Sequence, residues 1–226
     1  EFIGDRPGLD ELREVLPAEH DLRLTEKRKK NIVILVTKEP HCLGDLLIRH
    51  AYDEMEANIL AVVGNQYRLA PLVERFGIPF HYLTHEGKER AQHEAEVLEV
   101  LGNYAPEYVV LAKYMRILSE EFIARYRYRM INIHHSFLPA FIGANPYRQA
   151  FERGVKIIGA TAHFVTADLD EGPIIAQGVM PVDHTHDAKD MAQAGRDVEK
   201  NTLAKALRLV FDDRVFVYGN RTVIFE

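Results

Sequence analysis

The stretch NIVILVT, at positions 31–37, is an almost uninterrupted apolar run. Strands have this composition when both of their faces are buried, as they are in a parallel sheet. A second run, NILAVVG at 58–64, follows a helix-like segment over 42–56. Apolar runs at 107–112 and 129–134 repeat the pattern. This alternation of apolar strands with helix-like segments predicts an α/β fold built on a parallel sheet.

The rest of the chain supplies connecting helices and a second group of strands. Two longer apolar runs in the second half read as strands that pair with each other, and the chain closes with a hairpin whose turn is Gly219-Asn220. The expected helices lie at 8–16, 68–76, 87–103, 119–126, 145–154 and 188–212, and the further expected strands at 20–24, 156–166, 173–183 and within 215–225.

Composition narrows the class of protein. The chain has 226 residues, 47% of them hydrophobic, which suits one domain with a sizeable core. Its net charge of -6 gives no basic footprint for nucleic acid. No apolar stretch approaches the roughly 20 residues that span a bilayer, and a single cysteine excludes an intrachain disulfide framework. We therefore expect a cytoplasmic protein that binds neither nucleic acid nor membrane.

Polar side chains stand at the end of the strand expected over 129–134. Strand side chains alternate, so Asn132 and His134 share one face. Pro139 then ends regular pairing, and NPYRQAFERG (145–154) begins a helix with its asparagine as N-cap. Ligands of open parallel sheets bind beyond the carboxyl ends of the strands. An amide that can stabilise an oxyanion and a histidine thus stand at an expected pocket rim, but polar residues are common at strand ends, and the pattern alone favours a structural role over a catalytic one.

A second polar element is the segment TAHFVTADLDEGPIIAQ at 161–177. Asp168 and Asp170 lie in a tight loop between two expected strands. A carboxylate there can charge or orient a histidine or activate water, but an ordinary acidic turn has the same composition. His163 lies within the first of these strands, where a hydrogen-bonded core histidine is the structural alternative.

The sequence lacks the residue spacing of several well-known catalytic and binding motifs. The chain has no G-x-G-x-x-G after the first strand, no G-x-x-x-x-G-K-[ST], no H-E-x-x-H and no G-x-S-x-G. His184 and His186 lack the further ligand pattern of a zinc site, so no metal is expected. Cys42 lies next to His41, and we interpret it as a small buried residue of a helix and not as a nucleophile.

Two motifs taken together, NIHHSFLPAFIGANPY and GATAHFVTADLDEGPIIAQ, resemble those of the folate-dependent formyltransferase family. HCLGDLL, GIPFHYL, VVLAKYMRILS, GRDVE and DRVFVYGNRTVIF are similar to its deformylase branch. The resemblance covers about 31–226 and implies a Rossmann-like formyltransferase fold, with a mostly parallel open sheet flanked by helices as the catalytic domain. Residues 1–30 resemble the remnant of an ACT-type α+β regulatory domain and its linker.

The resemblance also implies an activity and a site. The deformylase branch hydrolyses formyltetrahydrofolate to formate and tetrahydrofolate, which supplies formate for purine synthesis and balances one-carbon pools, without a metal or redox cofactor. The implied catalytic residues are Asn132, His134 and Asp170. The implied substrate-binding residues are Arg116, Ile117, Leu118, His163, Thr166 and Asp168.

Other functions are compatible with the same sequence motifs. Within the family they are formyl transfer to glycinamide ribonucleotide or to methionyl-tRNA, and outside it a folate-binding module without turnover. The ribonucleotide transferases of the family carry a glycine-rich phosphate loop at the place where this chain reads VTKEPHCLGDLL. The absence of that loop's glycines from this stretch favours water as the acceptor of the formyl group. GRDVEKN (195–201) is expected to cover the acceptor position with polar groups. The family further implies a homo-oligomer and amino-acid effectors, with methionine and glycine as candidates.

Overall fold

The computed structural model describes residues 11, 14, 15, 27–139 and 146–225. The remnant domain predicted for 1–30 therefore falls mostly outside the described residues, and so do the helix expected at 8–16 and the strand at 20–24. The N-cap predicted for Asn145 lies outside them as well.

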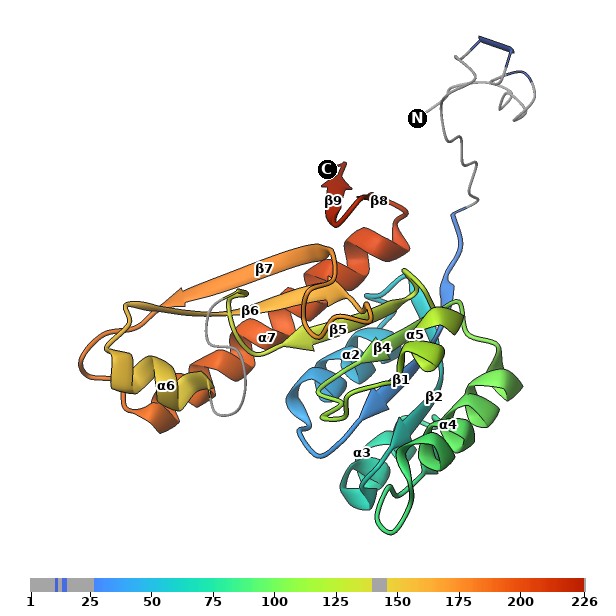
Figure 1. The fold of residues 1–226 in the computed structure, drawn as a ribbon, viewed down its shortest axis with the longest axis horizontal. Coiled ribbons are helices and arrows are strands. Elements are labelled where there is room, and N and C mark those ends of the chain that lie inside the picture. Colours follow the sequence, from blue (N-terminus) through green and yellow to red (C-terminus); the bar gives the residue numbers. More distant parts are fainter. Residues whose placement is uncertain (1–10, 12–13, 16–26, 140–145, 226) are drawn as a thin grey trace.

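Seven strands form one twisted sheet (Figure 1). They are β1 (Lys30–Val36), β2 (Ala57–Gly64), β3 (Phe80–Tyr82), β4 (Tyr108–Leu111), β5 (Met130–His134), β6 (Ile157–Phe164) and β7 (Ile174–Pro181). Their order is β3-β2-β1-β4-β5-β6-β7. The neighbours from β3 to β5 are parallel, whereas β6 runs antiparallel to both β5 and β7. The predicted mostly parallel open sheet is confirmed.

Helices flank the sheet, and a separate hairpin follows the last of them. The helices are α2 (His41–Ala51), the 3-10 turn η1 (Tyr67–Leu69), α3 (Ala70–Glu74), α4 (Arg90–Tyr104), α5 (Glu120–Arg125), α6 (Pro146–Arg153) and α7 (Ala188–Phe211). The hairpin pairs β8 (Val215–Tyr218) with β9 (Arg221–Ile224). Gly219 in its turn has φ +58°, a conformation that glycine adopts without strain, and the predicted hairpin is confirmed.

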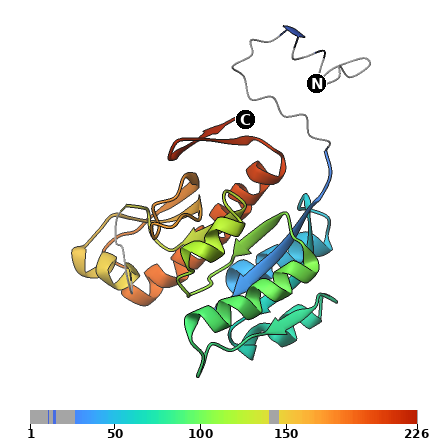
Figure 2. The same cartoon turned by 45° about the vertical axis from the view of Figure 1, so that its right-hand side comes forward.

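The strand that opens the sheet explains the two-sided packing. Ile32, Ile34 and Val36 pack on one face of the sheet with apolar side chains of α2 and α7. Val33 and Leu35 pack on the opposite face with α4 and α5 (Figure 2). All five side chains are fully buried, which is why the sequence reads as a continuous apolar run instead of an alternating one.

Two elements differ from the sequence prediction. The helix expected over 42–56 ends at Ala51, because Asp53 takes a left-handed backbone conformation (φ +61°) and turns the chain toward β2. The edge strand β3 was not predicted, since a three-residue strand carries no periodic signal. Among the described residues, no helix is long and apolar enough to cross a membrane.

Candidate active site

Strand pairing brings the first polar residues together. Asn132 on β5 lies opposite His163 on β6, and His134 lies opposite Thr161. The Asn132 Nδ2 and His163 Nε2 atoms are 3.2 Å apart. His163 Nδ1 lies 2.9 Å from the Phe164 carbonyl oxygen, which can only accept, so Nδ1 carries a proton.

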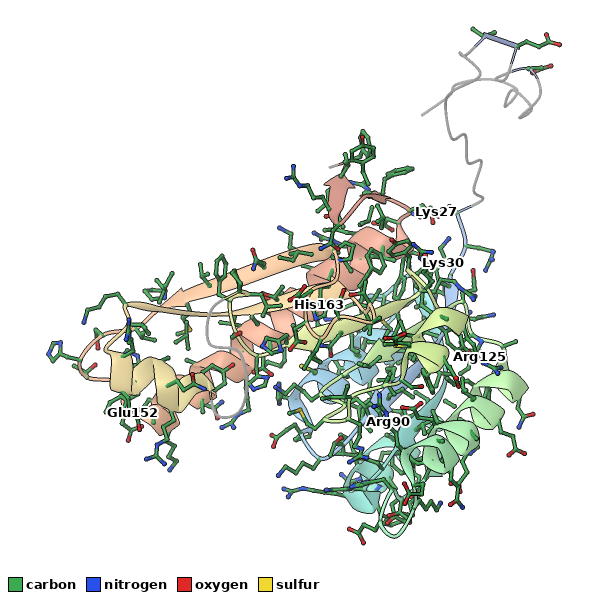
Figure 3. All side chains as sticks on the ribbon, viewed as in Figure 1. Lys27, Lys30, Arg90, Arg125, Glu152 and His163 are labelled. Atoms are coloured by element: carbon green, nitrogen blue, oxygen red, sulfur yellow. The ribbon has the colours of Figure 1, made fainter. Side chains whose placement is uncertain are left out.

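Asp170 joins this pair from the loop between β6 and β7. Its Oδ2 lies 3.2 Å from His134 Nδ1, and its Oδ1 lies 3.6 Å from His163 Nε2. Figure 3 shows His163 near the middle of the molecule. Burial opposes ionisation of Asp170, but its contacts with His134 and His163 outweigh burial and hold its pKa well below its usual range. The carboxylate is therefore available to stabilise a positive charge on His134.

The loop that carries Asp170 is held in an unusual shape. Asp170 itself has φ +58°. Gly172 allows close approach of the backbone, because a Cβ there would lie 1.8 Å from the Phe164 carbonyl oxygen. The Asn220 side chain, from the turn of the β8–β9 hairpin, donates to the Glu171 carbonyl oxygen at 2.9 Å. The hairpin thus supports the loop, a role that sequence reasoning missed because Asn220 read only as a turn residue.

The segment that follows β5 is fixed by side chains of β6 and β7. The Thr161 hydroxyl donates to the Ser136 carbonyl oxygen at 2.9 Å and accepts from the Leu138 N–H at 3.1 Å. The Gln177 amide donates to the Leu138 carbonyl oxygen at 3.1 Å. These bonds set the path of the chain directly beyond His134.

A cavity of about 590 Å³ opens beside these groups. Its size lies within the usual range for small-molecule sites. Asn132, His134 and Asp170 all line it. The other residues that line it are Leu111, Lys113, Tyr114, Met115, Arg116, Ile117, Leu118, Ile123, Ile133, His135, Tyr147, His163, Val165, Thr166, Ala167 and Leu169.

The cavity includes all but one of the residues expected at the site. Asp168 is not among its lining residues, and its carbonyl oxygen instead accepts from the Thr166 hydroxyl at 3.2 Å within the loop. Among the described residues, His134 Nε2 is buried without a hydrogen-bond partner. Because His134 lines the cavity, this nitrogen is free to bond a ligand there.

The cavity also includes polar residues that sequence reasoning missed, namely Lys113, His135 and Tyr147. The pKa of His135 is lowered to about 4 by burial, by the Lys113 ammonium and by His134. His135 and Tyr147 both fall within NIHHSFLPAFIGANPY, and Lys113 falls within VVLAKYMRILS, but neither motif by itself assigned them a role. Only the fold reveals that they share one cavity.

The carboxylate of Glu199, on α7, contacts three other side chains. Its Oε2 lies 2.7 Å from His41 Nε2 and 3.1 Å from Lys113 Nζ, and its Oε1 accepts from the Tyr147 hydroxyl at 2.5 Å. Burial opposes ionisation of Glu199, but the His41 bond, Lys113 and Tyr147 outweigh it and lower its pKa to about 2. Glu199 lies within the GRDVEKN segment that the sequence singled out.

His41, Cys42 and Glu199 each offer one atom that could bind a metal ion, and these atoms lie within 4.8 Å of one another. The Lys113 ammonium already places a positive charge on this carboxylate. Burial raises the pKa of the Cys42 thiol far above its usual range and keeps it protonated, which disfavours it as a metal ligand. Cys42 is 1% exposed, so its predicted place as a buried helix residue is confirmed.

A mostly parallel open sheet flanked by helices is the fold that the sequence resemblance to the formyl transferases implied. The sequence matches the Formyl transferase family over residues 30–207, and the chain belongs to this family. A formyltetrahydrofolate deformylase from Haemophilus influenzae is 57% identical over 216 residues, which are 96% of this chain and 78% of the relative. Within the family, the chain thus groups with the formyltetrahydrofolate deformylases.

Solved structures agree with this grouping. A formyltetrahydrofolate deformylase from Pseudomonas syringae superposes with a TM-score of 0.86 at 46% identity, covering 88% of this chain and 67% of that one. A glycinamide ribonucleotide transformylase from Symbiobacterium toebii gives a TM-score of 0.83 at 29% identity, covering 93% and 100%. The fold is therefore shared with transferring enzymes, and the choice between water and an amine acceptor must be made by particular side chains.

Proposed function

We propose that this protein hydrolyses formyltetrahydrofolate to formate and tetrahydrofolate. The proposal rests on the group formed by Asn132, His134 and Asp170, in which His134 Nδ1 lies 3.2 Å from Asp170 Oδ2 at the wall of a cavity of about 590 Å³. The 57% identity to a formyltetrahydrofolate deformylase supports the same conclusion.

The proposed mechanism follows from the charge that develops during amide hydrolysis. Attack of water on the formyl carbon gives a tetrahedral oxyanion. Asn132, through its amide N–H, and charged His134, through Nε2–H, donate hydrogen bonds to that oxygen. Each such donor typically lowers the barrier by roughly 3–4 kcal/mol. Asp170 keeps His134 charged through Oδ2, while Oδ1 accepts from the attacking water and orients or deprotonates it. The folate nitrogen gains a proton as the C–N bond breaks.

The cavity suggests how the folate is placed. Ile117, Leu118, Val165 and Leu169 give one part of its lining an apolar character that suits the face of a pterin ring. Arg116, His163 and Thr166 provide polar groups beside it. In this arrangement the loop that carries Asp170 lies over the bound pterin, so that binding the ring and placing the carboxylate depend on the same segment.

The direct test uses substrate labelled in the formyl group, with no acceptor added. The wild-type protein is expected to release labelled formate. Asn132→Ala and His134→Ala are each expected to lower kcat by about 100-fold or more while leaving the fold intact. Near-wild-type turnover in His134→Ala would remove that residue from the mechanism.

The chemistry proposed here requires no metal or redox cofactor, and prolonged dialysis against a chelator is expected to leave kcat unchanged. We further propose that the protein acts in the cytoplasm as a homo-oligomer, and that methionine or glycine modulates it through an ACT-type domain. Identical kinetics of the full-length protein with and without each amino acid would count against this regulation.

Transfer to a ribonucleotide is the alternative that the shared fold keeps in view. The loop between β1 and α2 disfavours transfer to a ribonucleotide. Pro40 directly precedes α2 and has no N–H to offer a phosphate, and no side chain caps this helix end. Glu39 adds a negative charge to the same loop. A phosphate-bearing acceptor would therefore find few of the backbone donors that it needs in this loop.

A further inference from the structure

The geometry points to a group of four side chains that decides which nucleophile reaches the formyl carbon. We propose that Lys113, Glu199, His41 and Tyr147, here called the acceptor-side network, exclude amines from the cavity and so restrict the acceptor to water. The inference deepens the proposed hydrolysis and rests on it.

Lys113 is the member of the network with the most unusual backbone. It follows β4 with φ +65°, the left-handed conformation that glycine adopts most readily. Lysine is nevertheless present, and its side chain is 8% exposed. Lysine is rarely buried to this extent unless it is paired, and here Nζ meets Glu199 Oε2 at 3.1 Å. A strained backbone and a buried charge at one position indicate a side chain that is needed where it lies.

The network lies beside the reacting groups. Lys113 and Tyr147 line the same cavity as Asn132 and His134. The ring of His135 bridges the two sets, with its centroid 5.0 Å from that of His134 and 6.3 Å from that of Tyr147. The apolar lining that suits the pterin comes from other residues of the cavity, so Lys113 and Tyr147 border the remaining space, from which a nucleophile would approach.

Volume and charge both favour water in that space. The Lys113 stem and the Tyr147 ring fill room that an amine with substituents would need. The Lys113 ammonium already pairs with the Glu199 carboxylate at 3.1 Å, so neither charge is available to bind a charged acceptor. An acceptor that displaced Lys113 would leave the Glu199 carboxylate buried without its cationic partner. A water molecule needs none of this room and forms hydrogen bonds with these polar groups.

Both nucleophiles would use the same reaction centre. In hydrolysis, a water oxygen bonds to the formyl carbon, the bond from that carbon to the folate nitrogen breaks, and the nitrogen takes up the proton that water loses. In transfer to an amine, a nitrogen–carbon bond forms in place of the oxygen–carbon bond and the amine loses the proton. The catalytic group serves either course, so access to the formyl carbon is one determinant of the ratio of the two products.

The test supplies glycinamide as a small amine acceptor together with formyltetrahydrofolate labelled in the formyl group. The measured quantity is the ratio of N-formylglycinamide to formate. Lys113→Gly opens the space and suits the backbone at φ +65°, and it is expected to raise this ratio by about tenfold or more over wild type. Lys113→Gly combined with Glu199→Gln removes both charges and guards against instability from an unpaired carboxylate. Tyr147→Phe removes only a hydroxyl and is expected to raise the ratio less.

The matched control is Lys30→Ala. Lys30 is also a buried ion-paired lysine, with a side chain 7% exposed and Nζ 2.8 Å from Asp213 Oδ2, but it does not line the cavity. Figure 3 shows it well apart from His163. This variant is expected to keep the wild-type ratio. If wild type releases formate and every folded network variant keeps its product ratio, the inference is wrong. If wild type itself releases no formate, the proposed function is wrong.

Discussion

Replacing Asp170 with asparagine isolates the charge that the proposed mechanism assigns to this position. The substitution keeps the size and shape of the side chain and removes its negative charge. Asp170 Oδ2 lies 3.2 Å from His134 Nδ1. For two full charges at that distance and an effective dielectric constant of about 20, the attraction is roughly 5 kcal/mol. Since each 1.36 kcal/mol changes a rate tenfold, kcat is expected to fall by about 10² to 10⁴.

The assay follows formate release at saturating formyltetrahydrofolate, so that kcat is separated from KM. Because Asp170 helps in the transition state more than in substrate binding, KM is expected to change little. The pKa of Asp170 lies below its ordinary value, so the carboxylate stays ionised at every pH above that ordinary value. The defect of Asp170→Asn is therefore expected to persist across neutral and mildly acidic pH, and raising the pH is not expected to rescue the variant.

Asp183→Asn is the matched control. Asp183 also pairs with a histidine, with its Oδ1 2.9 Å from His186 Nδ1, but this exposed pair does not line the cavity. It is expected to keep wild-type kcat. A folded Asp170→Asn variant with kcat within threefold of wild type would refute the electrostatic role assigned to Asp170.

Three further predictions concern stability and loop support. The pKa of Glu199 is lowered from 4.5 to about 2, so the stability that its carboxylate contributes is present above pH 4.5 and is lost as the pH falls toward 2. The free energy of unfolding, measured by urea titration, is therefore expected to fall less between pH 6 and pH 3 in Glu199→Gln than in wild type, by about 2 kcal/mol. Gly195→Ala would bring a Cβ within 2.1 Å of Tyr147 Cζ and is expected to cost about 1–3 kcal/mol, whereas Gly102→Ala on α4 meets nothing within 4 Å and is expected to stabilise by about 0.5–1 kcal/mol in the same titration. Asn220→Ala removes the bond to the loop of Asp170 and is expected to lower kcat about fivefold with little change in thermal stability; equal loss of both would indicate a merely structural role.

Sequence pattern predicted the elements that have strong periodicity. The run over 31–37 predicted β1 because its side chains are buried on both faces of the sheet. Asn132 and His134 followed from the same logic, since alternation on β5 directs both toward one face. The resemblance singled out Asp170 from the pair Asp168 and Asp170, and the structure places Asp170 beside His134.

Other features depend on contacts that no local pattern encodes. The three-residue strand β3 is ordered by pairing with β2, and pairing leaves no trace in so short a segment. Lys113 and Tyr147 meet Glu199 only because the segment after β4 and helix α6 both lie against α7. Asn220 supports a loop about 50 positions earlier in the chain. Such contacts are products of the fold and could not be read from spacing.

In the proposed reaction, water takes the formyl group in this site. The most direct measurement supplies formyltetrahydrofolate labelled in the formyl group together with saturating glycinamide ribonucleotide, and follows the label in both products from the first turnover. The account predicts that the label enters formate at the rate seen without ribonucleotide, and that this release is lost in His134→Ala. Label that enters the ribonucleotide faster than formate forms would contradict it.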